Sequence, residues 1–226
     1  MTDASSWQDS DGHAPARASW DEAGVEPEQR TAPRFTLLIR TAKLVGASGE
    51  YLCIVRDVSP QGLKVRTFYP LPRDEEFAIE LASGERHPVG KVWEEGELTG
   101  FRFAVPVALE RLLAEAPEGM RKRSVRLRLA MPATLVAGGR PANATFVDIS
   151  QHGACVECEQ YLAKDERVRI DCDWLPELTA RVRWRKRPLY GLIFEQTFRF
   201  DELAKLTAPL QARTLAARAP QRRAVG

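Results

Sequence analysis

The sequence predicts an all-β protein with minor α content, built as two small antiparallel β-barrels in tandem, each followed by a C-terminal helix. Three observations lead to this fold. A motif-bearing segment occurs twice at constant spacing, apolar and polar residues alternate in both copies, and turns containing Gly and Pro separate the alternating segments. Alternation with a period of two gives each strand one apolar face, and short strands of this kind close into small barrels.

The internal repeat sets the domain organisation. Residues 54–67, IVRDVSPQGLKVRT, recur as residues 145–158, TFVDISQHGACVEC, at an offset of 91 positions. Upstream, residues 34–40 lie over residues 126–132 at an offset of 92, so one residue is deleted in between. The offset of 91 also relates three further pairs, Trp93 and Trp184, Gly100 and Gly191, and Phe103 and Phe194.

The repeats predict one domain over residues 29–118 and a second over residues 119–215. Residues 1–28 hold seven acidic residues and one basic residue, a net charge of −6, with few aliphatic side chains. Such a leader lacks the apolar surface that would offset the entropy lost on ordering, so we expect it to be disordered. Residues 216–226 are rich in Ala and Arg, and we expect this tail to fray.

Each copy shows strand periodicity followed by helix periodicity. In the first copy Leu63 and Val65 alternate with basic residues, and in the second Val168 and Ile170 alternate with polar ones. Pro209 is expected to end or kink the second helix. The helical apolar positions are Leu109, Leu112, Leu113 and Ala116 in the first copy and Phe200, Leu203, Leu206 and Leu210 in the second. The aligned Trp93 and Trp184 are expected to lie in the two barrel cores.

Composition excludes several classes of protein. The chain of 226 residues is 44% hydrophobic and 28% charged, as in ordinary globular proteins. No apolar run reaches the length of a membrane helix, and the first residues lack the pattern of a signal peptide. Four cysteines in a chain without a signal peptide favour reduced thiols, so we expect a cytoplasmic protein without membrane association. Residues 119–226 hold 20 basic and 11 acidic residues, a net charge of +9, which favours an anionic partner.

Two short motifs in the repeated unit carry candidate chemistry. Arg30 and Arg34 form an R-x-x-x-R pair just before the first strand, and Asp57, Ser59 and Gly62 form D-x-S-x-x-G. The planar guanidinium of Arg pairs with phosphate or with the O6/N7 edge of guanine, and it stacks on bases. A carboxylate accepts hydrogen bonds from guanine nitrogens, and Gly allows close backbone approach. The same D-x-S-x-x-G residues also favour a simple turn, in which their side chains bond the backbone.

This combination of motifs resembles the PilZ family of cyclic di-GMP receptors, and the resemblance covers nearly all of residues 29–210. It implies ligand-binding roles for the five motif residues of the first copy. In the second copy the corresponding residues are Lys122, Arg126, Asp148, Ser150 and Gly153. Lysine at position 122 lacks the bidentate fork of Arg, so we expect the first domain to bind the ligand more tightly.

Other chemistry is disfavoured by the sequence. Cys155 and Cys158 have C-x-x-C spacing, but an odd separation on a strand sends the two thiols to opposite faces. No G-x-S-x-G, H-E-x-x-H or P-loop motif occurs, and His152 lies within a single turn with Asp148 and Ser150, which is unusual for a catalytic triad. We therefore expect neither an enzyme nor a metal or cofactor site.

The sequence leaves three functions open. The first is a non-enzymatic receptor that binds cyclic di-GMP and passes the signal to a downstream protein partner by domain rearrangement or direct binding. The second is a degenerate tandem that acts only as a protein-interaction module. The third, which we consider less favoured, is a nucleic-acid-binding protein that uses the basic residues 121–128 and 181–187.

Overall fold

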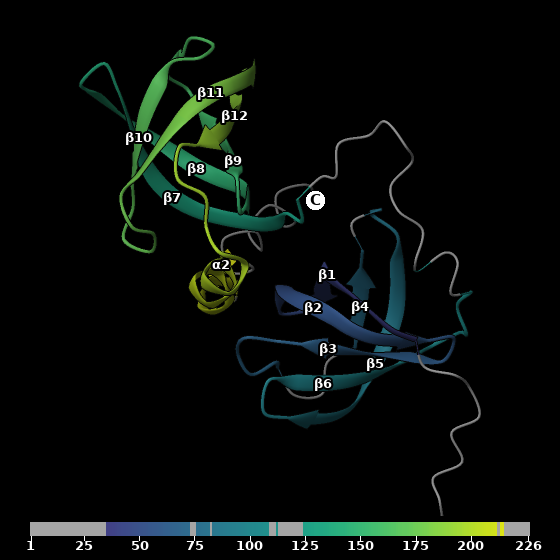
Figure 1. Ribbon diagram of the computed structural model, residues 1–226. Helices are drawn as coiled ribbons and strands as arrows, with labels where there is room; N and C mark the ends of the chain where they lie inside the picture. The colour runs from purple at the N-terminus through teal and green to yellow at the C-terminus, as the bar shows by residue number, and fades with distance from the viewer. Residues whose placement is uncertain are drawn as a thin grey trace, which may run out of the picture. The chain divides into compact units, whose positions relative to one another are not determined.

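The computed structural model contains two closed antiparallel barrels of six strands each (Figure 1). It describes residues 35–72, 76–81, 83–108, 112, 124–211, 213 and 214, and for residues 35–39 the backbone alone. The strands of the first barrel are β1 (Phe35–Gly46), β2 (Gly49–Ser59), β3 (Gly62–Arg66), β4 (Phe77–Glu80), β5 (Arg86–Glu95) and β6 (Leu98–Phe103). Those of the second are β7 (Leu127–Ala137), β8 (Arg140–Ser150), β9 (Gly153–Cys158), β10 (Arg167–Asp171), β11 (Leu178–Lys186) and β12 (Leu189–Phe194).

The two barrels have the same topology. The strands follow the order β1-β2-β3-β6-β5-β4 in the first and β7-β8-β9-β12-β11-β10 in the second. The predicted fold class, tandem small antiparallel barrels with little helix, is therefore confirmed. The predicted boundaries of the segments 1–28, 29–118, 119–215 and 216–226 fall outside the described residues and stay predictions.

Irregularities in strand pairing also repeat, and they correct one detail of the sequence alignment. The β1–β2 register shifts between Thr36 and Arg40, and the β7–β8 register shifts between Arg128 and Met131. Three residues lie between Thr36 and Arg40 in β1, whereas only two lie between Arg128 and Met131 in β7. Arg40 therefore corresponds to Met131 and not to Pro132, because the one-residue deletion falls inside this irregular stretch of the strand.

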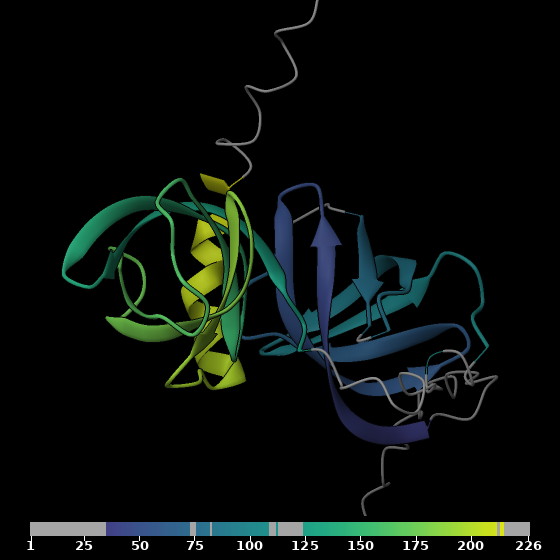
Figure 2. The same cartoon turned by 90° about the horizontal axis from the view of Figure 1, so that it is seen from above.

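Each barrel encloses its own core, and the second core extends to the neighbouring barrel. Outside the barrel strands, α2 (Phe200–Thr207) and the 3₁₀ turn η1 (Ala208–Leu210) contribute Leu203 and Leu210 to the second core. The helix lies across one end of the barrel in both views (Figures 1 and 2). Leu52 and Phe68 from the first barrel also belong to this cluster, and both barrels lie in one compact unit of the chain.

The second predicted helix is confirmed, whereas most of the first lies outside the described residues. In α2 and η1, Leu203 and Leu210 are buried, and Phe200 and Leu206 pack against the same cluster. The α-helix ends at Thr207, and Pro209 lies in the 3₁₀ turn that follows. For the first copy, Leu112 is buried in the first core, and Leu109, Leu113 and Ala116 are not described. No helix among the described residues has the length and apolarity needed to cross a bilayer.

The two aligned tryptophans are not in the cores, so this prediction is wrong. Trp93 and Trp184 are 41% and 44% exposed on the outer faces of their barrels. In β11 the register shifts between Val182 and Trp184, which leaves Arg183 as an extra residue. An extra residue reverses the alternation of a strand. The side chain of Trp184 therefore points outward although that of Val182 points into the core.

Candidate ligand-binding site

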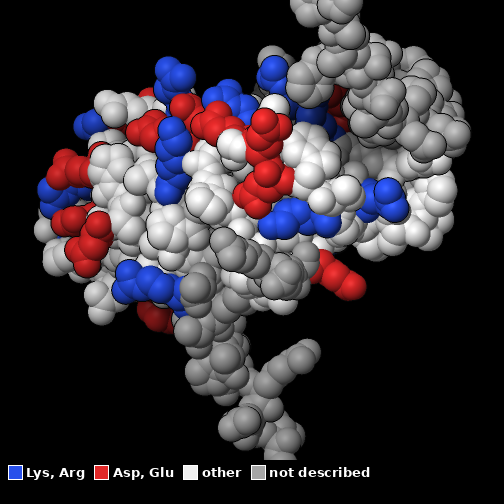
Figure 3. Space-filling model, turned by 90° about the horizontal axis from the view of Figure 1, so that it is seen from below, with Lys and Arg blue, Asp and Glu red and all other residues white. Residues whose placement is uncertain are grey.

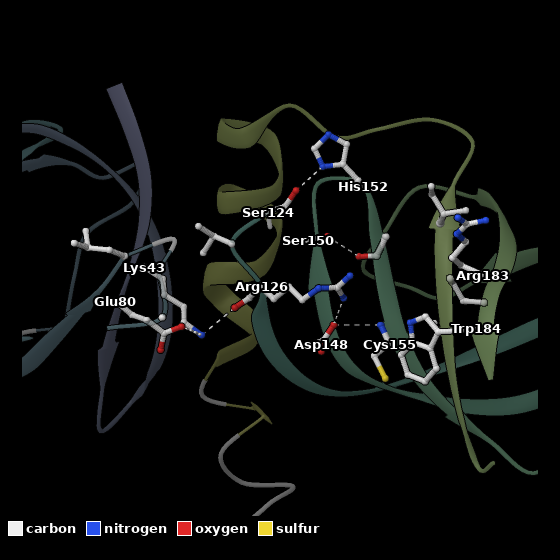
Figure 4. Close-up of a pocket in the computed structure, with 17 residues that line it drawn as sticks. Lys43, Glu80, Ser124, Arg126, Asp148, Ser150, His152, Cys155, Arg183 and Trp184 are labelled. Atoms are coloured by element: carbon white, nitrogen blue, oxygen red, sulfur yellow. Dashed lines mark hydrogen bonds and ion pairs between the residues drawn. The ribbon is translucent and has the colours of Figure 1, made fainter. Parts of the chain in front are cut away.

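A pocket of about 800 Å³ opens on the outer face of the second barrel, where the segment before β7 and the strands β8, β9, β11 and β12 bring polar side chains together (Figure 4). This volume is in the range of small-molecule sites. Residues of the first barrel complete the wall of the pocket. The polar and aromatic groups of interest are Arg126, Asp148, Arg183 and Trp184 from the second barrel and Lys43 and Glu80 from the first.

Arg126 and Asp148, both predicted site residues, form an ion pair in this pocket. The Nη1 atom of Arg126 donates to Oδ1 of Asp148 at 2.5 Å, and the same oxygen accepts the backbone N–H of Cys155 at 3.2 Å. The β7–β8 register pairs Arg128 with Asp148, which places Arg126 just ahead of the strand and beside the carboxylate. The pair fixes one nitrogen of a guanidinium that has five N–H donors, so the others remain for a ligand.

Ser150 and Gly153 build the turn between β8 and β9. The hydroxyl of Ser150 donates to the carbonyl oxygen of Gly153 at 3.0 Å, and the serine is 1% exposed. A Cβ atom on Gly153 would stand 2.1 Å from the carbonyl oxygen of Leu192 on β12. Glycine is therefore required by the close approach of two strands. Both residues line the pocket, but their observed contacts are those of the turn that the same motif predicts.

Trp184 is the functional candidate that the sequence analysis misplaced. Its indole lies flat over Gly191, where an added Cβ would come within 1.9 Å of Nε1. The extra residue in β11 also keeps Arg183 on the outer face, so an exposed guanidinium and an exposed aromatic ring stand side by side at the pocket. The signal was present in the sequence as the paired Trp and Gly of the two repeats.

Cys155 lies in the pocket, whereas Cys158 belongs to the barrel core, as the odd spacing predicts. Desolvation, together with the nearby Asp148 carboxylate, raises the pKa of the Cys155 thiol to about 11. The thiol is therefore neutral at physiological pH. All four cysteines are free, and no group of three potential metal ligands occurs among the described residues.

His152 does not join Asp148 and Ser150 in a catalytic arrangement. Its Nδ1 atom lies 2.8 Å from the hydroxyl of Ser124, the residue that begins the described part of the second barrel. The hydroxyl of Ser150 is bonded to Gly153. Ser124 and His152 therefore form one end of the pocket.

The first barrel repeats the turn and the exposed tryptophan, but other residues of the site differ. The hydroxyl of Ser59 and the backbone of Gly62 form the same turn at 3.2 Å, and Trp93 lies over Gly100 as Trp184 lies over Gly191. Asp57, however, forms an ion pair with Lys64 on β3, at the position that Cys155 holds in the second barrel. The three remaining predicted site residues, Arg30, Arg34 and Lys122, lie outside the described residues.

The second barrel thus presents a candidate small-ligand site that combines arginines, a carboxylate and an exposed indole. Residues 120–208, which contain all of its strands, match the PilZ domain family. The second half of the chain is therefore similar to PilZ domains. The first half repeats its barrel topology, and the two together form tandem PilZ-like barrels.

Comparison with other proteins adds distant similarities. The PlzA protein of Borreliella burgdorferi in complex with c-di-GMP is 11% identical over 75% of this chain and 87% of that chain, with a TM-score of 0.33. The MrkH–c-di-GMP complex of K. pneumonia is 15% identical over 77% and 89%, with a TM-score of 0.31. YcgR of Escherichia coli in complex with c-di-GMP is 14% identical over 80% and 88%, with a TM-score of 0.30. No curated protein matches the sequence.

Proposed function

We propose that this protein is a non-enzymatic cytoplasmic receptor that binds cyclic di-GMP in the pocket of its second barrel. The observation that carries the proposal is the convergence of Arg126, Asp148 and Trp184 on one pocket of a PilZ-like barrel. All four cysteines have free thiols, which is consistent with a reducing compartment such as the cytoplasm.

Each group has a defined task in this proposal. Arg126, held at one nitrogen by Asp148, presents its remaining donors to a phosphate or to the O6/N7 edge of guanine. Asp148 accepts hydrogen bonds from guanine nitrogens, and the exposed indole of Trp184 offers a stacking surface for the purine. Arg183 adds a second cation beside that surface. Ser150 and Gly153 act by shaping the turn that holds the carboxylate.

The proposal extends to the first barrel as a second site. Ser59 and Gly62 form the same turn as their counterparts, and Asp57 occupies the strand position of Asp148. The sequence supplies Arg30 and Arg34 for the R-x-x-x-R motif. We propose that the bound state acts on a downstream protein partner by domain rearrangement or by direct contact.

The basic residues of β11 offer less support for nucleic-acid binding. Arg181 is paired with Glu195, and Arg185 lies over the ring of Tyr161 with its centre 4.9 Å from the ring centroid. On the face shown in Figure 3, basic and acidic side chains are interspersed. A duplex requires a continuous cationic surface to displace its counterions.

The test is calorimetric titration of the full chain with cyclic di-GMP, GTP and a short DNA duplex at two salt concentrations. We expect saturable binding of the cyclic dinucleotide alone. Arg126→Ala is expected to weaken it by about 1.5–3 kcal/mol, the range for charge-assisted hydrogen bonds. Because Arg126 is half-exposed, its loss should leave the melting temperature nearly unchanged. Salt-sensitive binding of DNA alone would support the nucleic-acid alternative, and binding of no ligand would leave the protein-interaction module.

A further inference from the structure

A buried cluster of charges connects the first barrel to the segment that carries Arg126. Lys43 on β1 and Glu50 on β2 are 5% and 7% exposed, although both occupy outward-facing positions of their barrel. Charged side chains are rarely buried to this degree unless they are paired. The partners of Lys43 and Glu50 therefore indicate why these charges are buried.

The ammonium group of Lys43 has three oxygen partners. It contacts Glu50 Oε2 at 2.9 Å, Glu80 Oε1 at 3.2 Å and the backbone carbonyl oxygen of Arg126 at 3.0 Å. The first two partners belong to its own barrel, and the third belongs to the other. Figure 4 shows this ammonium between Glu80 and the Arg126 carbonyl, at the edge of the pocket.

Glu50 holds the same segment from the other side of Arg126. Its Oε2 accepts the backbone N–H of Arg128 at 2.9 Å, and its Oε1 lies 3.7 Å from Nε of Arg128. Two backbone groups that flank Leu127, the first residue of β7, are thus bound by side chains of the first barrel. The backbone N–H of Glu50 donates to Oε1 of Gln211, which joins this hairpin to the segment after the C-terminal helix.

The cluster is not part of the repeated unit. The offset of 91 relates Lys43 to Thr134 and Glu50 to Pro141, and neither of these is charged or buried. The repeat alone therefore does not explain the two charges. Their shared feature is contact with the backbone at Arg126 and Arg128.

We propose that Lys43 and Glu50 are positioning residues for the ligand site of the second barrel, fixing the backbone from which Arg126 reaches Asp148. The inference rests on the proposed function, because it assigns a role in ligand binding. It adds that affinity at the second barrel depends on side chains of the first. By linkage, ligand binding then strengthens the contact between the barrels by the same factor.

The test uses the full chain and the double variant Lys43→Met/Glu50→Met, because Met at position 50 cannot accept the hydrogen bond from the Arg128 amide. Removing both charges avoids leaving one of them buried without its partner, so the fold is retained. The matched control is Phe68→Leu, which weakens a different contact between the barrels, the edge-to-face packing of Phe68 on Phe200 with centroids 6.0 Å apart. Two quantities are measured: hydrogen exchange at the Arg128 amide without ligand, and the affinity for cyclic di-GMP.

The double variant is expected to exchange the Arg128 amide at least ten-fold faster and to bind the ligand about ten-fold more weakly. The control should change neither quantity. Unchanged exchange in the double variant overturns the inference, and so does faster exchange with unchanged affinity or an equal loss of affinity in the control. If the wild-type chain binds no cyclic di-GMP, the proposed function falls, and the exchange rates still decide whether Lys43 and Glu50 hold the segment.

Discussion

Replacement of Trp184 by Ala tests the stacking surface of the site directly. Trp184 is 44% exposed and lines the pocket while its indole covers Gly191, so part of its surface is accessible to a purine. Stacking of a base on an aromatic side chain contributes about 1–3 kcal/mol. The variant should therefore bind cyclic di-GMP roughly 5- to 150-fold more weakly. Because Trp184 lies outside the core cluster, we expect its loss to lower the free energy of unfolding by about 1 kcal/mol or less.

Calorimetry gives the affinity, and thermal unfolding gives the stability of the same sample. Tryptophan fluorescence adds an independent signal, because ligand stacking on Trp184 should change the emission of the wild-type chain more than that of the variant. Trp93→Ala is the matched variant of the first barrel, since Trp93 lies over Gly100 as Trp184 lies over Gly191, and it should leave binding at the second barrel unchanged. Wild-type affinity together with a wild-type fluorescence change in Trp184→Ala would refute the stacking role.

Two further predictions concern the turn glycine and the pocket thiol. Gly153→Ala should destabilise the protein by about 1–3 kcal/mol, because the added Cβ would stand 2.1 Å from a backbone oxygen. Gly90→Ala is the control, because there is open space at that position, and it should leave the melting temperature unchanged. A raised pKa of about 11 keeps Cys155 in its unreactive thiol form. Its alkylation at pH 8 should therefore be roughly 100-fold slower than that of a thiol with a pKa near 9. The alkylation rate should increase with pH up to about 11. Mass spectrometry of alkylated peptides measures this rate, and rapid labelling of Cys155 at pH 8 would contradict it.

The duplicated barrels could be predicted because their signals are local. Alternation of apolar residues fixes which face of a strand is buried, and the repeated D-x-S-x-x-G sets the strand–turn–strand unit in both copies. The turn interpretation of that motif is seen in the bonds of Ser59 and Ser150. The strands and the turn are each determined by a few neighbouring residues, so they can be predicted from one sequence.

Two features of the site could not be predicted from periodicity. The outward direction of Trp184 depends on the extra residue Arg183, and nothing in the alternation marks where a strand gains a residue. The burial of Lys43 and Glu50 depends on contact with another barrel, which a pattern within one strand does not encode. Both features arise from the pairing of distant segments, and both lie at the candidate site.

The structure adds a competing argument on which barrel binds more tightly. The sequence favours the first barrel, which has both Arg30 and Arg34. In the structure, however, the carboxylate of Asp57 is already paired with Lys64 on the adjacent strand. Asp148 is paired as well, but its partner Arg126 is itself a proposed ligand contact, whereas Lys64 is not. Lys64 therefore occupies an acceptor site of Asp57 that guanine would otherwise use.

The variant Lys64→Cys copies the second barrel, because Cys155 occupies the equivalent position opposite Asp148. It should be made in an Arg126→Ala chain, where binding at the second site is weakened. If the ion pair restrains Asp57, Lys64→Cys should raise the residual affinity for cyclic di-GMP a few-fold, and calorimetry should show the stoichiometry approaching one ligand per first barrel. Because the Asp57 side chain is only 15% exposed, loss of its partner should lower stability, which thermal unfolding of the same variant measures. Tight residual binding that Lys64→Cys leaves unchanged would contradict this argument. It would mean that Arg30 and Arg34 decide the affinity of the first barrel and that Asp57 has only a structural role.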